Sequence, residues 1–176
     1  MYYVNQNLVD LHRIVYQNNR KEYLRLDLNE NPGGLPQEFI DEVLNDITPK
    51  FVSQYPETLE FENCLAKFLN VNNDNLCLVN GSSEGIRHII EAFSAPGGKI
   101  VGVVPSYAMY QVYAQMYGRE FIQVKYNDDL TISADTIIDA LSEDVDLLVL
   151  LNPNNPVGNA YSNEEFEKIL EAAKKY

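Results

Sequence analysis

Along the second half of the chain, short apolar runs alternate with segments whose apolar residues recur at helical spacing. The short runs predict four β-strands: Leu76–Val79, Lys99–Val104, Phe121–Tyr126 and Leu147–Leu151. The segments with helical spacing predict four helices: Ile86–Phe93, Ala108–Met116, Ala134–Leu141 and one opened by a capping box at Ser162 and Glu165. This alternation predicts an α/β fold with a mostly parallel sheet and helices on both faces.

The first half of the chain is less regular. Four elements are predicted there: a short, partly detached helical arm at Asn7–Tyr16, a short strand at Leu24–Leu28, a helix from Pro36 that Pro49 stops, and a helix after Tyr55-Pro56. We find no internal repeat, low-complexity segment or linker between these elements and the second half.

Length and the last predicted element indicate a longer protein. The 176 residues fit one domain, or one large lobe of something bigger. The chain stops at Tyr176, at the end of a helix, where an alternating fold would enter its next strand. We therefore expect this sequence to be truncated, a part of a longer chain.

The charge excludes two classes of partner. Lys and Arg number 13 against 26 Asp and Glu, and the net charge of −13 repels nucleic acid and anionic lipid. The apolar runs are too short to span a bilayer and no signal peptide opens the chain, so we expect a cytoplasmic protein.

Cys64 and Cys77 form no CxxC pair. We predict that both are small buried hydrophobes, and we predict no metal site.

Three loops follow predicted strands, at the sheet edge where open α/β folds bind ligands. Asn80–Gly85 places small residues before a helix N-terminus, which suits a phosphate, although an ordinary turn would look the same. Tyr107 follows Pro105 and Ser106, where its ring can stack on a flat ligand or simply pack. Asn152–Gly158 places two prolines and three amides after a buried strand, and an Asn there can donate to an oxyanion such as a phenolate.

Five motifs carry a resemblance to a known family. In chain order they are Leu28-Asn29-Glu30-Asn31-Pro32, Tyr55-Pro56, Gly81-Ser82-Ser83-Glu84-Gly85-Ile86, Pro105-Ser106-Tyr107-Ala108-Met109-Tyr110 and Asn152-Pro153-Asn154-Asn155-Pro156-Val157-Gly158. The set covers about Leu24–Tyr176. It resembles the pyridoxal-phosphate-dependent aminotransferases of fold type I, class I/II, and most of all their histidinol-phosphate aminotransferase branch.

The resemblance implies a domain organisation and a cofactor site. Residues 1–48 would form an N-terminal arm and a segment of the small domain, and residues 49–176 the N-terminal part of the large domain, which binds pyridoxal 5′-phosphate. Ser82 and Ser83 would hold the cofactor phosphate. Tyr107 would stack on the pyridine ring, and Asn155 would hydrogen-bond the ring hydroxyl oxygen.

The resemblance also implies a second copy of the chain and a small-molecule substrate. Tyr55 would reach the phosphate bound by the neighbouring subunit of a homodimer, and Asn29 would lie near the carboxylate of an amino-acid substrate. Two positions depart from the family pattern. Val157 stands where the family usually has Thr, and Ser83 stands where it often has Asp.

The reaction implied is transamination of an amino acid or amino phosphate. The family's Schiff-base lysine is expected beyond Tyr176, and none of the eight lysines here stands in a matching context. We therefore nominate no catalytic residue and expect this chain alone to be inactive. A non-catalytic fragment and a lyase similar to threonine-phosphate decarboxylases stay open as alternatives. The absence of glycine fingerprints disfavours an unrelated nucleotide-binding module.

Overall fold

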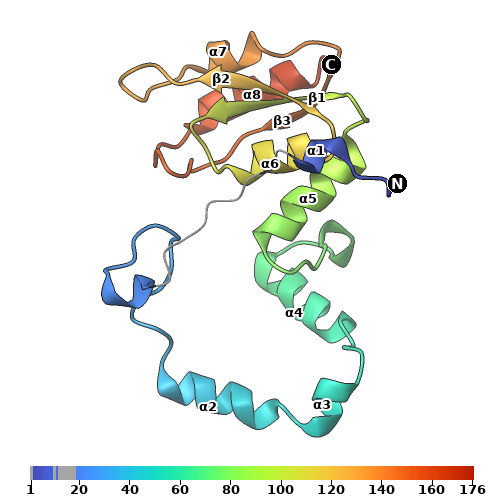
Figure 1. Ribbon diagram of the computed structural model, residues 1–176, viewed down its shortest axis with the longest axis vertical. Coiled ribbons are helices and arrows are strands. Elements are labelled where there is room, and N and C mark those ends of the chain that lie inside the picture. Colours follow the sequence, from blue (N-terminus) through green and yellow to red (C-terminus); the bar gives the residue numbers. More distant parts are fainter. Residues whose placement is uncertain (1, 10, 12–18) are drawn as a thin grey trace. The chain divides into compact units, whose positions relative to one another are not determined.

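The computed structural model describes residues 2–9, 11 and 19–176 (Figure 1). By its internal contacts the chain divides into two compact units, one made of Met1–His12 and Val79–Tyr176, the other of Arg13–Leu78. The boundary expected between residues 48 and 49 concerns the domains of a whole enzyme, and it stays a prediction. Within the described residues, no helix combines the length and hydrophobicity needed to cross a membrane.

The first unit is built on a parallel sheet. Among the described residues its strands are β1 (Lys99–Val104), β2 (Glu120–Lys125) and β3 (Val145–Val149), in the order β2-β1-β3. β1 pairs with β2 along its whole length and with β3 from Lys99 to Gly102. Because all three strands run parallel, their carboxyl ends meet at one edge of the sheet.

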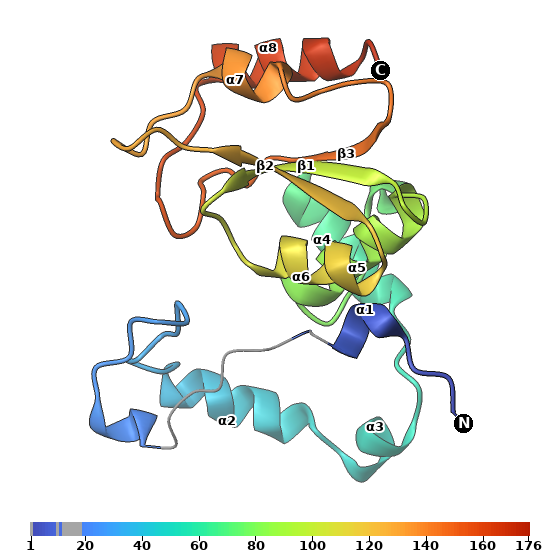
Figure 2. The same ribbon diagram turned by 45° about the horizontal axis from the view of Figure 1, so that its top comes forward.

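Helices cover both faces of this sheet. α5 (Ser82–Phe93) and α6 (Met109–Met116) lie on one face, and α7 (Ala134–Ile138) and α8 (Asn163–Ala173) lie on the other (Figure 2). α1 (Gln6–Val9) packs beside α6. The predicted α/β fold, with parallel strands and helices on both faces, is confirmed.

Alternating side chains of the central strand divide the core into two layers, because successive residues of a strand point to opposite faces. Val101 packs in the layer that contains Ile169 of α8. Ile100 packs in the opposite layer, which contains Ile90 of α5. All four side chains are fully buried, so each face of β1 is sealed by a helix.

Element boundaries in this unit follow the predictions closely, with three exceptions. α5 begins at Ser82, inside the predicted loop Asn80–Gly85, rather than at Ile86. β1 occupies the predicted residues, and the predicted capping box opens α8. β3 spans Val145–Val149 rather than Leu147–Leu151, because it begins where it pairs with Lys99, whereas Leu150 packs against the core without pairing. α7 ends at Ile138, and the rest of the predicted helix continues as a turn.

Two of the strand predictions are wrong. Leu76–Val79 and Leu24–Leu28 are neither helix nor strand. A strand is defined by hydrogen bonds to a neighbour, and within the described part of the chain no strand pairs with either segment. Of the predicted arm at Asn7–Tyr16, the structure shows the turn of helix α1, while residues 10 and 12–16 lie outside the described residues.

The regular elements of the second unit, within its described residues, are all helical. Its elements are the 3₁₀ turn η1 (Arg20–Glu22), α2 (Gln37–Asp46), α3 (Pro49–Ser53), α4 (Leu59–Leu69) and the 3₁₀ turn η2 (Asn73–Asn75). Pro49 follows α2 as predicted and also opens α3, since the first turn of a helix does not need its missing N–H. Thr48 caps this turn by accepting a hydrogen bond from Phe51 N at 3.1 Å.

Apolar side chains of the second unit remain exposed. Ala66 is the one buried hydrophobic residue among its described residues. The apolar stripe of α2 includes Phe39 and Leu44, which are 50% and 58% exposed. Cys64 and Cys77 are exposed too, which corrects the prediction that both are buried. On α4, Phe61 and Phe68 are 57% and 84% exposed, so little of the described chain packs against them.

Removing the cap of α8 has a predictable cost. The Ser162 hydroxyl accepts a hydrogen bond from Glu165 N at 3.2 Å, and the Glu165 carboxylate accepts one from Ser162 N at 2.9 Å. We expect Ser162→Ala to lower the free energy of unfolding by about 1 kcal/mol, measured by urea denaturation. Equal stability of this variant and the parent chain would contradict the cap.

The same cap makes stability depend on pH. The hydrogen bond from the backbone of Ser162 lowers the pKa of Glu165 below its usual 4.5. Glu165 therefore contributes stability that is present above about pH 4.5 and is lost as the pH falls through the lowered pKa. Gln does not titrate, so Glu165→Gln is the matched control. In this variant, the loss of stability on acidification that comes from Glu165 should be absent.

Candidate functional site

The loop before α5 leaves backbone donors available at a helix N-terminus. Gly81 precedes the helix with φ of +81° and ψ of 170°, a conformation essentially restricted to glycine. A Cβ on Gly81 would meet no atom within 4 Å, so the backbone conformation, and not a lack of space, requires glycine. The N–H groups of Ser82 and Ser83 have no acceptor among the described residues, and they lie at the positive end of the helix dipole.

A carboxylate holds this turn from inside the helix. Glu84 accepts hydrogen bonds from Asn80 N at 2.6 Å and from Asn80 Nδ2 at 3.1 Å. The bond from the Asn80 backbone is the main reason that the pKa of Glu84 lies below its usual value. Arg87 Nη2 lies 3.8 Å from the same carboxylate. Since the charge of Glu84 is engaged with Asn80, the amides of Ser82 and Ser83 are left for a ligand.

The structure brings the predicted phosphate loop and the predicted stacking residue together. Ser83 Oγ and Tyr107 Oη lie 3.2 Å apart, and either hydroxyl can be the donor. Tyr107 is half-buried just beyond the carboxyl end of β1. Its ring meets that of Tyr110 edge to face, with 6.2 Å between centroids and 88° between planes. Burial raises the pKa of the Tyr110 hydroxyl.

The loop after β3 is anchored by Asn154, which is only 4% exposed. Its Nδ2 donates to Pro105 O at 2.9 Å and to Tyr126 Oη at 2.8 Å, while its Oδ1 accepts from Ser106 Oγ at 2.8 Å. Tyr126 in turn donates to Asn159 Oδ1 at 2.8 Å. Sequence reasoning missed this residue, because nothing but its place among three amides distinguished it. A polar residue directly after a buried strand was the signal available.

The neighbouring Asn155 is the predicted ligand of the ring oxygen. It is half-buried, and its side chain makes no hydrogen bond within the described residues. The loop around it closes through two backbone bonds, Asn154 N to Asn159 O at 2.9 Å and Gly158 N to Asn154 O at 2.6 Å. The amide of Asn155 is therefore free to donate to a ligand from an ordered loop.

Tyr55 and Asn29 belong to the second unit, and their roles, toward the phosphate of the neighbouring subunit and toward the substrate carboxylate, stay predictions. Asn29 has a positive φ of 54°. Arg20 Nη2 lies 2.6 Å from Asp27 Oδ1 and 3.3 Å from Glu30 Oε2, so ion pairs hold both ends of the turn that presents Asn29. The hydrogen bond from Arg20 lowers the pKa of Asp27. Tyr55 is 98% exposed, so packing within this chain does not account for its ring.

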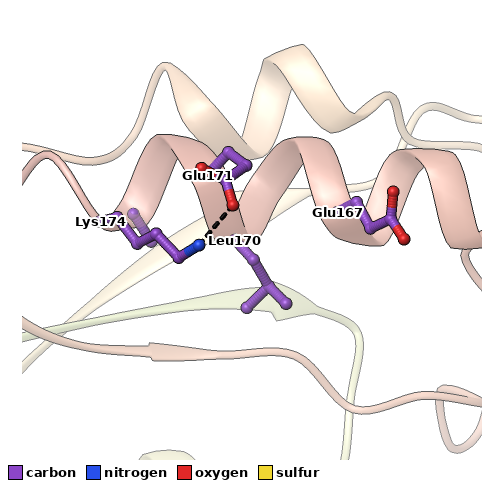
Figure 3. Close-up of a pocket in the computed structure, with 5 residues that line it drawn as sticks. Glu167, Leu170, Glu171 and Lys174 are labelled. Carbon is purple, nitrogen blue, oxygen red and sulfur yellow. Dashed lines mark hydrogen bonds and ion pairs between the residues drawn. The ribbon is translucent and has the colours of Figure 1, made fainter.

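A surface hollow of about 570 Å³ lies along α8, away from the predicted site residues. Its lining comes from the end of that one helix: Glu167, Leu170, Glu171, Ala173 and Lys174. Figure 3 shows Lys174 paired with Glu171, while Glu167 stands apart from both. Polar groups do not converge on a common point here, so we assign no ligand to this hollow.

Comparison with known proteins gives a single family. Residues 21–176 match the family model described as aminotransferase class I and II. The chain is 34% identical to the histidinol-phosphate aminotransferase of Chlorobaculum tepidum over 153 residues, which are 85% of this chain and 44% of that protein. The curated relatives compared are each covered over 42% to 48% of their length, so the chain spans less than half of them.

Solved structures agree with this assignment. The histidinol-phosphate aminotransferase of Clostridium acetobutylicum matches with a TM-score of 0.70 and 30% identity, over 84% of this chain and 42% of that one. Cystalysin from Treponema denticola, whose structure contains pyridoxal 5′-phosphate, matches with a TM-score of 0.67 over 79% of this chain and 37% of its own. Its identity of 18% shows a shared fold alone.

The residues of the first unit fit a group like pyridoxal 5′-phosphate, which presents a phosphate, a flat ring and a ring hydroxyl. The N–H groups of Ser82 and Ser83 have no other acceptor among the described residues, and phosphate binds well at such a helix N-terminus. Tyr107 offers a ring held by its contact with Ser83. The uncommitted amide of Asn155 offers a donor for the ring oxygen.

Proposed function

Because the chain belongs to the aminotransferase class I and II family, we propose that its strand-end loops bind pyridoxal 5′-phosphate for transamination of an amino acid or amino phosphate. Membership confirms the resemblance found in the five motifs, and with it pyridoxal 5′-phosphate as the cofactor of the family. The observation that carries the proposal is the contact between Ser83 and Tyr107, 3.2 Å between hydroxyls, which joins a phosphate loop to a ring platform.

The phosphate is held at the N-terminus of α5. Ser82 and Ser83 donate their backbone N–H groups and their hydroxyls, and the helix dipole adds to the attraction for the dianion. Gly81 allows the backbone to approach the phosphate, because it turns into the helix without a side chain. Hydrogen bonds between amides and an ionised oxygen are the strong ones, so this end of the cofactor contributes most of the affinity.

The ring is oriented by the two other loops. Tyr107 would cover one face of the pyridine ring, and Asn155 would donate to the ring oxygen, which would favour the deprotonated form of that oxygen. When bound, pyridoxal 5′-phosphate supplies the electron sink that the chemistry of amino groups needs. This chain's own contribution is to bind that group and to fix its orientation.

For the substrate we propose the histidinol-phosphate class. Support comes from the relatives in Chlorobaculum tepidum and Clostridium acetobutylicum, both of which are histidinol-phosphate aminotransferases. Asn29, on a turn held by Arg20, would lie near the carboxylate of the amino-acid or 2-oxo acid substrate, since histidinol phosphate itself has none. The reaction belongs to amino-acid biosynthesis, and we place it in the cytoplasm.

A pair of assays on the protein that carries this chain tests the reaction. With histidinol phosphate as the amino donor and a 2-oxo acid as the acceptor, we expect an amino acid to form from the 2-oxo acid. With threonine phosphate we expect no release of CO₂. Release of CO₂ from threonine phosphate, without amino transfer from histidinol phosphate, would favour a decarboxylase over an aminotransferase. It would not contradict the proposed cofactor site.

A second candidate function is cofactor binding without catalysis by this chain, because none of its eight lysines stands in the sequence context of the family's Schiff-base lysine. Three of them are engaged with carboxylates: Lys99 with Asp144, Lys168 with Asp135 and Lys174 with Glu171. An ion-paired, protonated lysine is a poor nucleophile. After incubation of this chain with pyridoxal 5′-phosphate and borohydride, peptide mapping should therefore show no single lysine labelled stoichiometrically. One fully labelled lysine, together with turnover of an amino donor, would contradict this candidate.

We further propose that the chain works as a homodimer in which Tyr55 serves the phosphate of the partner subunit. The nearly complete exposure of Tyr55 and the exposed stripe of α2 support it, since such surfaces drive association. We expect light scattering to give a mass above that of one chain, and Leu44→Glu, in the stripe, to lower that mass. A monomer at high concentration that binds no apolar dye would contradict the proposal.

A further inference from the structure

We propose that Asn154 is a positioning residue: its buried side chain ties the loop that carries Tyr107 to the loop that carries Asn155. The inference rests on the proposed function, because it concerns the orientation of the residues that hold the cofactor ring. Neither the five motifs nor the roles they imply assign any task to Asn154.

The first argument is the complete satisfaction of a buried amide. An Asn side chain can donate two hydrogen bonds from Nδ2, and both reach acceptors here, Pro105 O at 2.9 Å and Tyr126 Oη at 2.8 Å. The Oδ1 atom accepts from Ser106 Oγ at 2.8 Å. A group that is 4% exposed costs free energy unless it is paired in this way, and a fully paired network rigidifies its surroundings.

The second argument is topological. Pro105 and Ser106 directly follow β1, Tyr126 directly follows β2, and Asn154 stands in the loop after β3. One side chain thus joins the carboxyl ends of all three strands, at the edge where the candidate site lies. Tyr126 extends the connection by donating to Asn159 Oδ1 at 2.8 Å, at the far end of the same loop.

The third argument concerns the residues next in sequence. Tyr107 follows Ser106, and Asn155 follows Asn154, so each candidate ring ligand adjoins a member of the network. The side chain of Asn155 has no hydrogen bond of its own within the described residues. Its direction is therefore set by the backbone of the loop, which the side chain of Asn154 anchors.

The test measures binding of pyridoxamine 5′-phosphate, which lacks the aldehyde and so reports on the site without a lysine. Asn154→Asp keeps the shape and the acceptor but cannot donate to Pro105 O or Tyr126 Oη. We expect it to weaken binding by about tenfold. Tyr126→Phe removes the acceptor of one Asn154 Nδ2 hydrogen bond and also the bond to Asn159 Oδ1, and we expect it to weaken binding by about threefold. Asn152→Ala is the matched control, because Asn152 Oδ1 accepts only from Tyr161 N and does not bridge the loops. It should bind like the parent chain.

A second readout separates positioning from stability. If Asn154 aims Asn155 at the ring oxygen, Asn154→Asp should also raise the apparent pKa of the ring hydroxyl of bound pyridoxamine 5′-phosphate, followed by absorbance. A merely structural role would lower the midpoint of urea unfolding and leave that titration where it was. Should Asn154→Asp fail to fold, Ser106→Ala removes a single bond, and it is expected to shift the titration in the same direction by a smaller amount.

The outcomes distinguish this inference from the function on which it rests. If the parent chain binds no pyridoxamine 5′-phosphate, the proposed function and the inference fall together. If the parent binds and every folded variant titrates like it, the cofactor site stands and the positioning role of Asn154 is overturned. Weaker binding with a raised ring pKa in Asn154→Asp, and with neither change in Asn152→Ala, supports the role.

Discussion

Gly81→Ala is expected to lower the affinity for pyridoxamine 5′-phosphate by about tenfold or more, and the free energy of unfolding by about 1–3 kcal/mol. The reason is the backbone at Gly81, with φ of +81° and ψ of 170°, which a residue with a Cβ occupies only under strain. Relieving that strain rotates the peptide that leads into α5. The N–H groups of Ser82 and Ser83 then no longer converge on the phosphate.

Gly85→Ala supplies the matched control for this change. A Cβ at Gly85 would lie 3.5 Å from Val79 Cγ2, an ordinary contact, and the residue sits inside α5. Alanine in a helix interior is more stable than glycine by roughly 0.5–1 kcal/mol, so this variant should gain stability and bind the ligand like the parent. Equal losses of affinity in the two variants would show that the conformation of Gly81 is not what shapes the phosphate loop.

Asn155→Ala is expected to weaken binding of the same ligand by about 1–3 kcal/mol and to raise the pKa of its ring hydroxyl. A donor beside the ring oxygen stabilises the deprotonated form, so removing the donor makes deprotonation harder. Tyr107→Ala should weaken binding with a smaller effect on that pKa, because stacking depends less on where the ring proton sits.

Spectrophotometric titration of the bound ligand in both variants checks this contrast. The pKa of the ring hydroxyl should rise in Asn155→Ala and stay closer to that of the parent complex in Tyr107→Ala. If the two variants titrate alike, Asn155 is not the residue beside the ring oxygen. The amide side chains of the loop after β3 would then serve to hold the loop in place, as Asn154 does, and not to bind the ring oxygen.

Much of the sheet could be predicted from local pattern alone. β1 lies at the predicted residues because its apolar run is bounded on one side by glycines and on the other by Pro105. The cap of α8 was readable because a Ser and a Glu three residues apart satisfy one another. The strand predicted at Leu76–Val79 is absent, because a strand needs a neighbouring strand to pair with and the local sequence does not show whether one is present.

The candidate site shows the same difference between residues that act locally and residues that act through distant partners. Gly81, Ser82 and Ser83 were predictable because they act through a local turn and a helix end. Asn154 was not, because its importance comes from three partners in two other loops, brought together only by the parallel sheet. The five motifs indicated Asn155, whose side chain makes no hydrogen bond within the described residues.

Equilibrium dialysis of this chain with pyridoxamine 5′-phosphate, and in parallel with pyridoxamine, tests the central claim most directly. A site built on the N-terminus of α5 should bind one pyridoxamine 5′-phosphate per chain in a saturable way, and should bind pyridoxamine at least about 100-fold more weakly, because the phosphate contributes charge-assisted hydrogen bonds. Gly81→Ala should reduce the difference in affinity between pyridoxamine 5′-phosphate and pyridoxamine. Equal affinity for the two ligands, or no saturable binding of either, would contradict the account.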